Sequence, residues 1–228
     1  MELKKFENTE QMSLAAAVYT CNQIRQKTCK GEFFSIALSG GSSPVRFYEL
    51  LAEEKIDWTK VNIFLVDERK VPDNHVHSNY RMINKALLSK IDIPKINVFS
   101  FKTEIISASE CALEYEVRVR KVFADNYPVL DLIILGVGPD GHTASLFPGE
   151  DHTIEQDSIF IQAIAPSQFD IRERLTMTLS LINSAKSRIF VISGKGKGEM
   201  VQRVFEGDKN IPAGFINSSS TIFYDNPH

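Results

Sequence analysis

The stretch LIILGVGPDGHTASLFPG, residues 132–149, passes from four apolar residues into a glycine-rich loop. Such an apolar run is typical of a strand buried on both faces of a parallel sheet. Gly136, Gly138 and Gly141 match the pattern G-x-G-x-x-G, which forms the phosphate-binding turn of dinucleotide sites. The stretch therefore predicts a buried strand followed by a functional loop, which is either a dinucleotide site or a catalytic site.

A dinucleotide site needs a long helix directly after the glycine turn and an acidic residue about 20 positions further along the chain. Pro148 and Gly149 end any helix within seven residues of His142, and the next apolar run, 159–165, is followed by proline instead of a carboxylate. The carboxylate of Asp140 would also repel a diphosphate. These departures favour a catalytic loop.

Strand and helix patterns alternate along the rest of the chain. Apolar, β-branched runs predict strands at 33–39, 61–67, 97–101, 130–136, 159–165, 174–179 and 188–193, and helical spacing marks 9–29, 44–54, 78–89, 107–126 and 197–206. This alternation predicts a Rossmann-like, doubly wound α/β fold whose mostly parallel sheet has helices on both faces. Helices become scarce after residue 158, so we expect a few antiparallel strands in the C-terminal third. One domain over residues 1–228 is the simplest prediction, because no repeat or linker interrupts the pattern.

Composition limits the classes of partner. The 228 residues carry a formal net charge of -3, which gives no general attraction to nucleic acid or to an anionic membrane surface. No apolar run approaches the roughly 20 residues of a membrane span, and the start MELKKFENTEQ lacks the apolar core of a secretory signal. A cytoplasmic protein that binds neither nucleic acid nor membrane is therefore expected.

Ligands of doubly wound folds bind at the carboxyl ends of the strands, near the point where the strand order reverses. The loop SGGSSP, residues 39–44, follows a predicted strand. Gly40 and Gly41 leave backbone amides free, and Ser42 and Ser43 add hydroxyls at the start of a helix, which favours an anion. A tight turn with a serine cap explains the same residues, and both interpretations stay open.

The next strand ends in Asp67-Glu68-Arg69. The Asp67 carboxylate can accept a proton or a hydrogen bond and the Arg69 guanidinium can hold an anion, whereas a surface cluster of salt bridges is the alternative. His75 and His77 have no third ligand near them in sequence, and the three cysteines stand at no spacing typical of a metal site. No metal site is predicted.

Asp140-Gly141-His142 stands at the end of the buried strand quoted first. An imidazole titrates near neutrality and can take a proton from water and return one to a leaving group, so we favour His142 as a general base over a structural histidine. Arg174 begins a later strand pattern, and Lys195 and Lys197 precede the last helix in a glycine-rich segment. The basic residues suit an anion, and solvated side chains on a turn are the alternative.

Together these blocks resemble the 6-phosphogluconolactonase family. The resemblance rests on SGGSSP (39–44), VDERKVPDNHVHSNY (66–80) and LGVGPDGHTASLFPG (135–149), with RLT (174–176), Lys197 and Pro212-Ala213 following in the expected order. It covers nearly the whole chain. It implies a Rossmann-like fold and hydrolysis of 6-phospho-D-glucono-1,5-lactone to 6-phospho-D-gluconate in the oxidative pentose phosphate pathway, with no metal and no cofactor.

Glucosamine-6-phosphate deaminases share the fold, the glycine loop and the Asp-Gly-His tripeptide, and they are the main alternative. The resemblance gives them a tyrosine in the position of Arg69 and a glutamate in the position of Phe147, five residues after the histidine. A deaminase needs that glutamate for sugar ring opening, so a lactonase is favoured. A non-catalytic sensor of sugar phosphates is the third hypothesis.

For lactone hydrolysis we expect His142 to act as general base and then as general acid, while Asp140 or Asp67 orients the imidazole or the water. The expected oxyanion donors are either the backbone amides around 138–142 or Arg69. The other predicted site residues bind the phosphate or the sugar: Gly40, Gly41, Ser42, Ser43, Gly141, Arg174 and Lys197. The predicted partner is a small-molecule sugar phosphate lactone, bound by a monomer or a small homo-oligomer.

Overall fold

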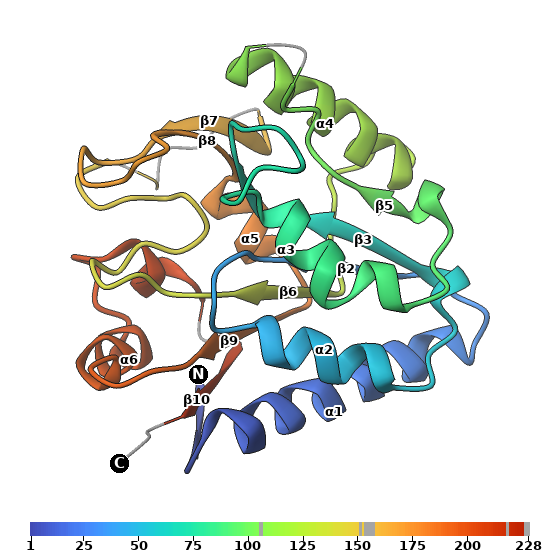
Figure 1. Ribbon diagram of the computed structural model, residues 1–228, viewed down its shortest axis with the longest axis horizontal. Helices are drawn as coiled ribbons and strands as arrows, with labels where there is room; N and C mark the ends of the chain where they lie inside the picture. Colours follow the sequence, from blue (N-terminus) through green and yellow to red (C-terminus); the bar gives the residue numbers. More distant parts are fainter. Residues whose placement is uncertain (105–106, 151, 153–157, 218, 226–228) are drawn as a thin grey trace.

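A seven-stranded parallel sheet forms the centre of the molecule (Figure 1). The computed structural model describes residues 1–104, 107–150, 152, 158–217 and 219–225. In spatial order the strands are β1 (Glu2–Phe6), β10 (Ser220–Asp225), β9 (Ser187–Ile192), β6 (Leu132–Leu135), β2 (Phe34–Leu38), β3 (Val61–Leu65) and β5 (Val98–Phe99). Every neighbouring pair is parallel. The predicted mostly parallel sheet is confirmed.

A smaller antiparallel sheet lies beside it, in the order β4 (Asp67–Arg69), β8 (Glu173–Met177) and β7 (Phe160–Ile164). The antiparallel strands expected in the C-terminal third are β7 and β8. The backbone of Val66 joins the two sheets, because its amide donates to Leu38 of β2 and its carbonyl accepts from Met177 of β8. The predicted strand 61–67 is therefore two strands, one in each sheet.

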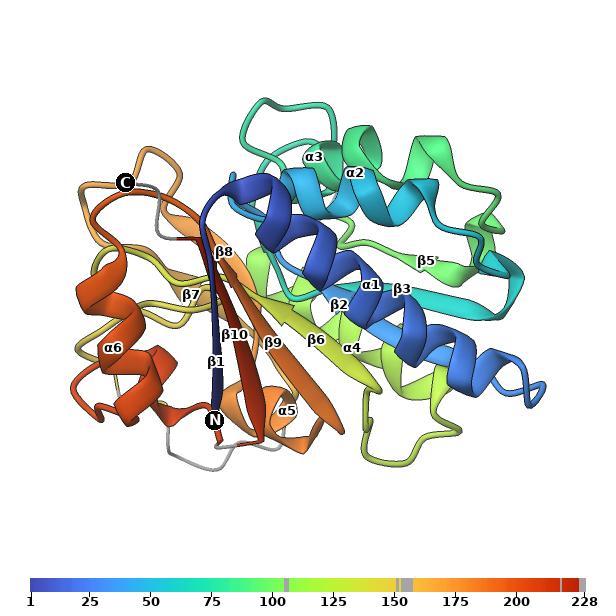
Figure 2. The same ribbon diagram turned by 90° about the horizontal axis from the view of Figure 1, so that it is seen from below.

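Helices cover both faces of the large sheet, as predicted (Figure 2). On one face α1 (Thr9–Thr28) packs against α2 (Val45–Glu53), which packs against α3 (Asn79–Ala86). The other face carries α4 (Ala108–Val122), α5 (Leu179–Ser184) and α6 (Gly198–Glu206). Ser107 begins α4 with a capping box closed by Glu110, and Ser78 caps α3.

The two central strands, β2 and β6, are buried along their whole length because helices lie on both sides of them. From β2 the chain moves outward to β3 over the face of α2, and from β6 it moves in the opposite direction to β9 over the other face. The loops that follow β2 and β6 therefore diverge, which leaves a crevice at the carboxyl ends of these adjacent strands.

Candidate active site

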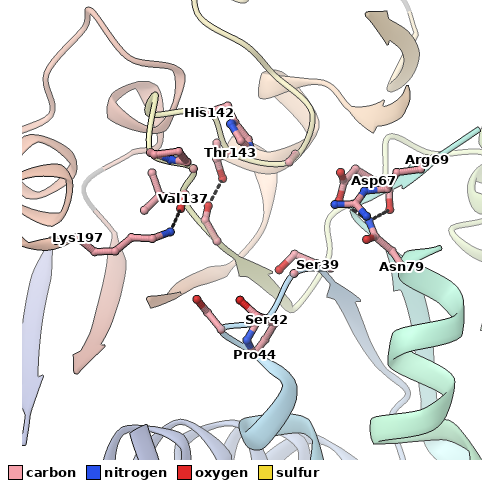
Figure 3. Close-up of a pocket in the computed structure, with 17 residues that line it drawn as sticks. Ser39, Ser42, Pro44, Asp67, Arg69, Asn79, Val137, His142, Thr143 and Lys197 are labelled. Atoms are coloured by element: carbon pink, nitrogen blue, oxygen red, sulfur yellow. Dashed lines mark hydrogen bonds between the residues drawn. The ribbon is translucent and has the colours of Figure 1, made fainter. Parts of the chain in front are cut away.

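A cavity of about 240 Å³ lies in that crevice. Its walls are the glycine loop after β2, the start of β4, the loop after β6 and the segment before α6 (Figure 3). Eight of the predicted site residues line it: Gly40, Gly41, Ser42, Ser43, Asp67, Arg69, His142 and Lys197. Four segments far apart in sequence thus meet at one cavity.

The glycine loop presents donors to the cavity. Helix α2 begins with no side-chain cap, and the amides of Gly41, Ser42 and Ser43 donate to no acceptor within the part of the chain that the structure describes. Gly41 has a φ of +94°, which a side chain would disfavour. Such an uncapped helix start attracts an anion, so the serine-cap alternative finds no support. The Ser43 hydroxyl accepts from the Ser193 amide at 3.2 Å and still has its own proton to donate.

The imidazole of His142 is oriented by Asp140. The distance from Nδ1 to the Asp140 carboxylate is 2.5 Å. A carboxylate only accepts when ionised, so Nδ1 carries the proton and Nε2 keeps its lone pair. The ring also contacts Phe147 at 4.9 Å and Phe169 at 5.7 Å between ring centres. Of the two aspartates that the sequence left open, Asp140 is the one that contacts the imidazole, and it lies beside the histidine instead of lining the cavity.

In the turn around His142, backbone amides donate hydrogen bonds to acceptors within the turn itself. Gly138 N donates to the His142 carbonyl at 2.8 Å, Gly141 N to the Gly138 carbonyl at 3.1 Å, and His142 N to Asp140 at 3.2 Å. A side chain at position 138 would reach within 2.1 Å of the imidazole, so glycine is required there. These three amides are therefore not available as oxyanion donors, so the Asp140 amide and Arg69 stay as the predicted candidates.

The structure gives a backbone reason for glycine at position 141, which does not line the cavity, and its predicted binding role stays a prediction. Its φ is +85°, its carbonyl accepts from Ala213 N at 3.1 Å, and a Cβ would lie 2.5 Å from Ile211. The chain behind it forms a tight turn over residues 143–146. No helical turn follows His142 within the described residues of this loop.

The Asp67 carboxylate is held from two sides at the cavity wall. Its Oδ2 accepts from the Ser145 hydroxyl at 2.7 Å and its Oδ1 from the Asn79 side chain at 3.2 Å. Asn79 also lines the cavity and packs so closely on Gly40 that a Cβ there would lie 1.8 Å from its oxygen. Asp67 therefore has a fixed orientation, with lone pairs left over for a ligand.

Glu68 does not line the cavity, and its carboxylate binds backbone amides at the start of α3. It accepts from the amides of Arg69, Asn79 and Tyr80 and from the Ser78 hydroxyl. Burial raises the pKa of this carboxyl to about 7, although the amide hydrogen bonds act in the opposite direction. Of the three charged residues at the end of the strand, this one is structural.

Two arginines lie side by side on neighbouring strands. Arg69 of β4 is paired in register with Arg174 of β8, and the Nε atoms of both are buried with no acceptor among the described residues. Burial and the charge of Arg69 lower the pKa of Arg174, while Asp67 and Glu68 oppose this. Arg69 lines the cavity, but Arg174 packs over Phe169 and does not. The prediction that Arg174 joins the phosphate ligands is thus not supported by its position.

Of the two candidate lysines, Lys197 reaches the cavity and Lys195 is exposed outside it. Lys197 donates from Nζ to the Val137 carbonyl at 2.7 Å. Burial lowers the pKa of its ammonium group, partly offset by Asp140. Lys197 and the group of Asp67 and Arg69 lie on opposite sides of the cavity (Figure 3).

Sequence reasoning missed several residues of the site. Asn79 and Ser145 stand in the quoted sequence blocks without an assigned role in the site, and Phe169 was not singled out. Their contacts join segments that are distant in sequence, such as the 78 positions between Asp67 and Ser145, so no local pattern reveals them. Within the described ranges no cluster of three or more His, Cys, Asp or Glu side chains is arranged to hold a metal ion, and no helix is long and apolar enough to cross a membrane.

The sequence and the fold are similar to those of known proteins. The sequence model of the family described as glucosamine-6-phosphate isomerases/6-phosphogluconolactonase matches residues 7–224. The chain is 37% identical over 196 residues to a 6-phosphogluconolactonase of Synechocystis sp., covering 83% of this chain and 80% of that protein. It is 32% identical to a probable chloroplastic 6-phosphogluconolactonase of Oryza sativa, covering 97% and 73%. The crystal structure of 6-phosphogluconolactonase from Thermotoga maritima has a TM-score of 0.81 and 29% identity, with 98% of both chains covered.

Proposed function

The chain belongs to the glucosamine-6-phosphate isomerase/6-phosphogluconolactonase family, and we propose that it hydrolyses 6-phospho-D-glucono-1,5-lactone to 6-phospho-D-gluconate with His142 as the base. The observation that carries the proposal is the 2.5 Å contact between Asp140 and Nδ1 of an imidazole that lines the cavity. It leaves Nε2 free to take a proton from water.

The phosphate of the substrate would bind at the glycine loop and Lys197. The free amides of Gly41 and Ser42, the Ser43 hydroxyl and the uncapped start of α2 suit a dianion. Lys197 adds a positive charge with no carboxylate bound to its Nζ among the described residues. Binding energy from this remote phosphate would orient C1 of the lactone toward His142.

The carbonyl end of the lactone would lie toward Arg69 and Asp67. Arg69 has a buried Nε without an acceptor in the described chain. Its guanidinium would therefore stabilise the oxyanion that forms when water attacks C1. Asp67 would accept a hydrogen bond from the attacking water or from a sugar hydroxyl. Its fixed orientation supports such a role.

The proton then follows a closed cycle. His142 takes a proton from water as the new C1–O bond forms, and the tetrahedral intermediate collapses by breaking the bond from C1 to the ring oxygen. The imidazolium returns its proton to that ring oxygen, which becomes a hydroxyl. As proposed, the cycle needs neither a metal nor a cofactor.

Phe147 argues against the deaminase alternative. It occupies the position where the deaminases are expected to carry a glutamate, and its ring packs on His142 at 4.9 Å in a buried environment. No carboxylate is available there to assist ring opening. The cytoplasmic location and the monomeric or small oligomeric state stay predictions, and curated relatives include chloroplastic proteins.

The test is to follow acid release from freshly prepared 6-phospho-D-glucono-1,5-lactone at neutral pH above its spontaneous hydrolysis. We expect rapid hydrolysis of this compound and slow hydrolysis of the unphosphorylated lactone, because only the former fills the anion cradle. If the wild-type protein binds sugar phosphates but the lactone is hydrolysed only at its spontaneous rate, the protein would instead be a sensor of sugar phosphates. Equal rates on both lactones would contradict the phosphate-binding part of the proposal.

A further inference from the structure

Ser145 lies three positions after His142 and contacts the small sheet twice. Its hydroxyl donates to Asp67 Oδ2 at 2.7 Å, and its amide donates to the Thr176 hydroxyl at 3.1 Å. Asp67 and Thr176 are paired in register on the neighbouring strands β4 and β8. The buried residue Ser145 therefore connects the loop that carries His142, the proposed base, to the strand that carries Asp67.

The turn that carries Ser145 adopts an uncommon backbone conformation. Ala144 has a φ of +52°, a left-handed conformation that costs a non-glycine residue free energy, while the Leu146 amide closes the turn onto Thr143 at 3.0 Å. Such a conformation persists only where surrounding contacts over-determine it. The two hydrogen bonds of Ser145 are contacts of this kind.

Asp67 has a second donor on the opposite side. The Asn79 side chain, at the start of α3, donates to Oδ1 at 3.2 Å and to the Asp67 carbonyl at 2.9 Å. Hydrogen bonds to both oxygens fix the plane of the carboxylate. Asn79 alone would fix one oxygen and leave the plane free to rotate.

We propose that Ser145 is a positioning residue, which holds the Asp67 carboxylate in the orientation required for hydrolysis and couples it to the His142 loop. The proposal rests on the proposed function, since it assigns Ser145 a part in the same reaction. Ser145 does not line the cavity, so it acts through Asp67 and not on the substrate.

The chain offers a matched control at the other end of the large sheet. Ser35 is also buried, and its hydroxyl donates to Asp131 Oδ2 at 2.9 Å. Ser35→Ala removes the same kind of hydrogen bond to a buried carboxylate far from the cavity, together with the one that the Asp131 amide donates to the Ser35 hydroxyl at 3.1 Å. The two alanine variants thus separate the loss of a hydrogen bond from the loss of a positioned Asp67.

The experiment measures kcat, KM and Tm of Ser145→Ala and Ser35→Ala with the phosphorylated lactone. We expect kcat of Ser145→Ala to fall roughly tenfold or more, the scale of a hydrogen bond to a charged group, with KM nearly unchanged because the anion cradle is intact. Ser35→Ala should keep the wild-type kcat while losing a comparable amount of Tm.

A double-mutant cycle tests the route through Asp67. In an Asp67→Asn background, Ser145→Ala should change kcat by no more than about twofold, because the group that it positions is already altered. An equal loss in both backgrounds would overturn the proposal. Ser145→Cys keeps the volume and weakens the donor, so it serves where the alanine variant fails to fold, and an unchanged kcat would overturn the proposal.

The two proposals fail in different ways. Wild-type protein without activity on the lactone would remove the proposed function and the role of Ser145 with it. An active wild type whose kcat is untouched by Ser145→Ala and Ser145→Cys would remove the role of Ser145 alone.

Discussion

Charged side chains lie at both ends of the large sheet, but their hydrogen-bond partners differ between the two ends. At the amino ends of the strands, Asp131 accepts from Lys27 at 2.7 Å, from Lys186 at 2.9 Å and from the amide and hydroxyl of Ser35. At the carboxyl ends, Arg69 has a buried Nε without an acceptor in the described chain, and Lys197 donates to a carbonyl.

This difference in hydrogen-bond partners distinguishes the charged residues that stabilise the fold from those that are available to a ligand. A carboxylate whose lone pairs are filled by the protein stabilises the folded chain and has little left for a ligand. Cations and amides left without anions lower stability unless something else supplies the negative charge. We therefore expect substitutions at the amino end to change the free energy of unfolding and those at the carboxyl end to change the hydrolysis rate.

The largest effect on the carboxyl end outside His142 itself is expected from Asp140→Asn. The amide cannot offer a charged acceptor to Nδ1, so the imidazole loses its orientation and the imidazolium loses its counter-charge. We predict a fall in kcat of roughly 100-fold with a small change in Tm. Steady-state rates and a thermal melt of the same preparation check this, and a variant with wild-type kcat would remove Asp140 from the mechanism.

A smaller effect is expected from Lys197→Ala, with Lys195→Ala as its matched control two positions away. Loss of the cavity lysine should raise KM for the phosphorylated lactone by roughly tenfold and leave the unphosphorylated lactone unaffected. Lys195→Ala should match wild type. Equal effects of the two variants would show a general attraction instead of a defined cradle.

The pH dependence of KM sharpens this prediction. Burial lowers the pKa of Lys197, so its ammonium group is lost at a lower pH than that of an exposed lysine. KM of wild type should therefore rise on the alkaline side before exposed lysines titrate, whereas KM of Lys197→Ala should stay flat there. Parallel profiles for both proteins would contradict the assignment.

The smallest effect on the rate is expected from Asp131→Asn, which acts on the amino end. Burial alone would raise the pKa of Asp131, but the hydrogen bonds from Lys27, Ser35 and Lys186 outweigh it and lower the pKa below the usual 3.8. Its stabilisation is present above that pH and is lost as the pH falls through the lowered folded value. We predict a loss of about 2 kcal/mol at pH 7, with kcat unchanged.

Denaturant unfolding at two pH values checks the sign. The difference in unfolding free energy between wild type and Asp131→Asn should shrink once the pH is below the folded pKa of Asp131. A difference that grows on acidification would mean that the carboxylate is not the stabilising form.

Much of this arrangement could be predicted from the sequence because the signals are local. Buried runs such as 130–136 mark strands, and a glycine loop directly after a strand marks the carboxyl end of a parallel sheet. The charged strand β1 was missed, since Glu2, Lys4 and Lys5 hide its pairing at the sheet edge. β10 also went unpredicted, and the six-residue helix α5 is too short for a periodic pattern.

The predicted site was least accurate where a role depends on which residues meet across strands. Arg174 has the right charge and order in the sequence, but its guanidinium packs over Phe169 and does not line the cavity. Gly141 was assigned to binding, yet its close approach to Ile211 explains the glycine. Ser145 and Asn79 hold Asp67 through contacts that no spacing along the chain predicts.

The most direct measurement compares His142→Ala with Asp131→Asn, using kcat/KM on 6-phospho-D-glucono-1,5-lactone and Tm for each. We predict that His142→Ala loses at least about 100-fold in kcat/KM, the scale of a lost general base, and keeps its Tm. Asp131→Asn should show the reverse, a lowered Tm with wild-type kcat/KM. An active His142→Ala protein, or an inactive Asp131→Asn protein that is still folded, would contradict the division between the two ends of the sheet.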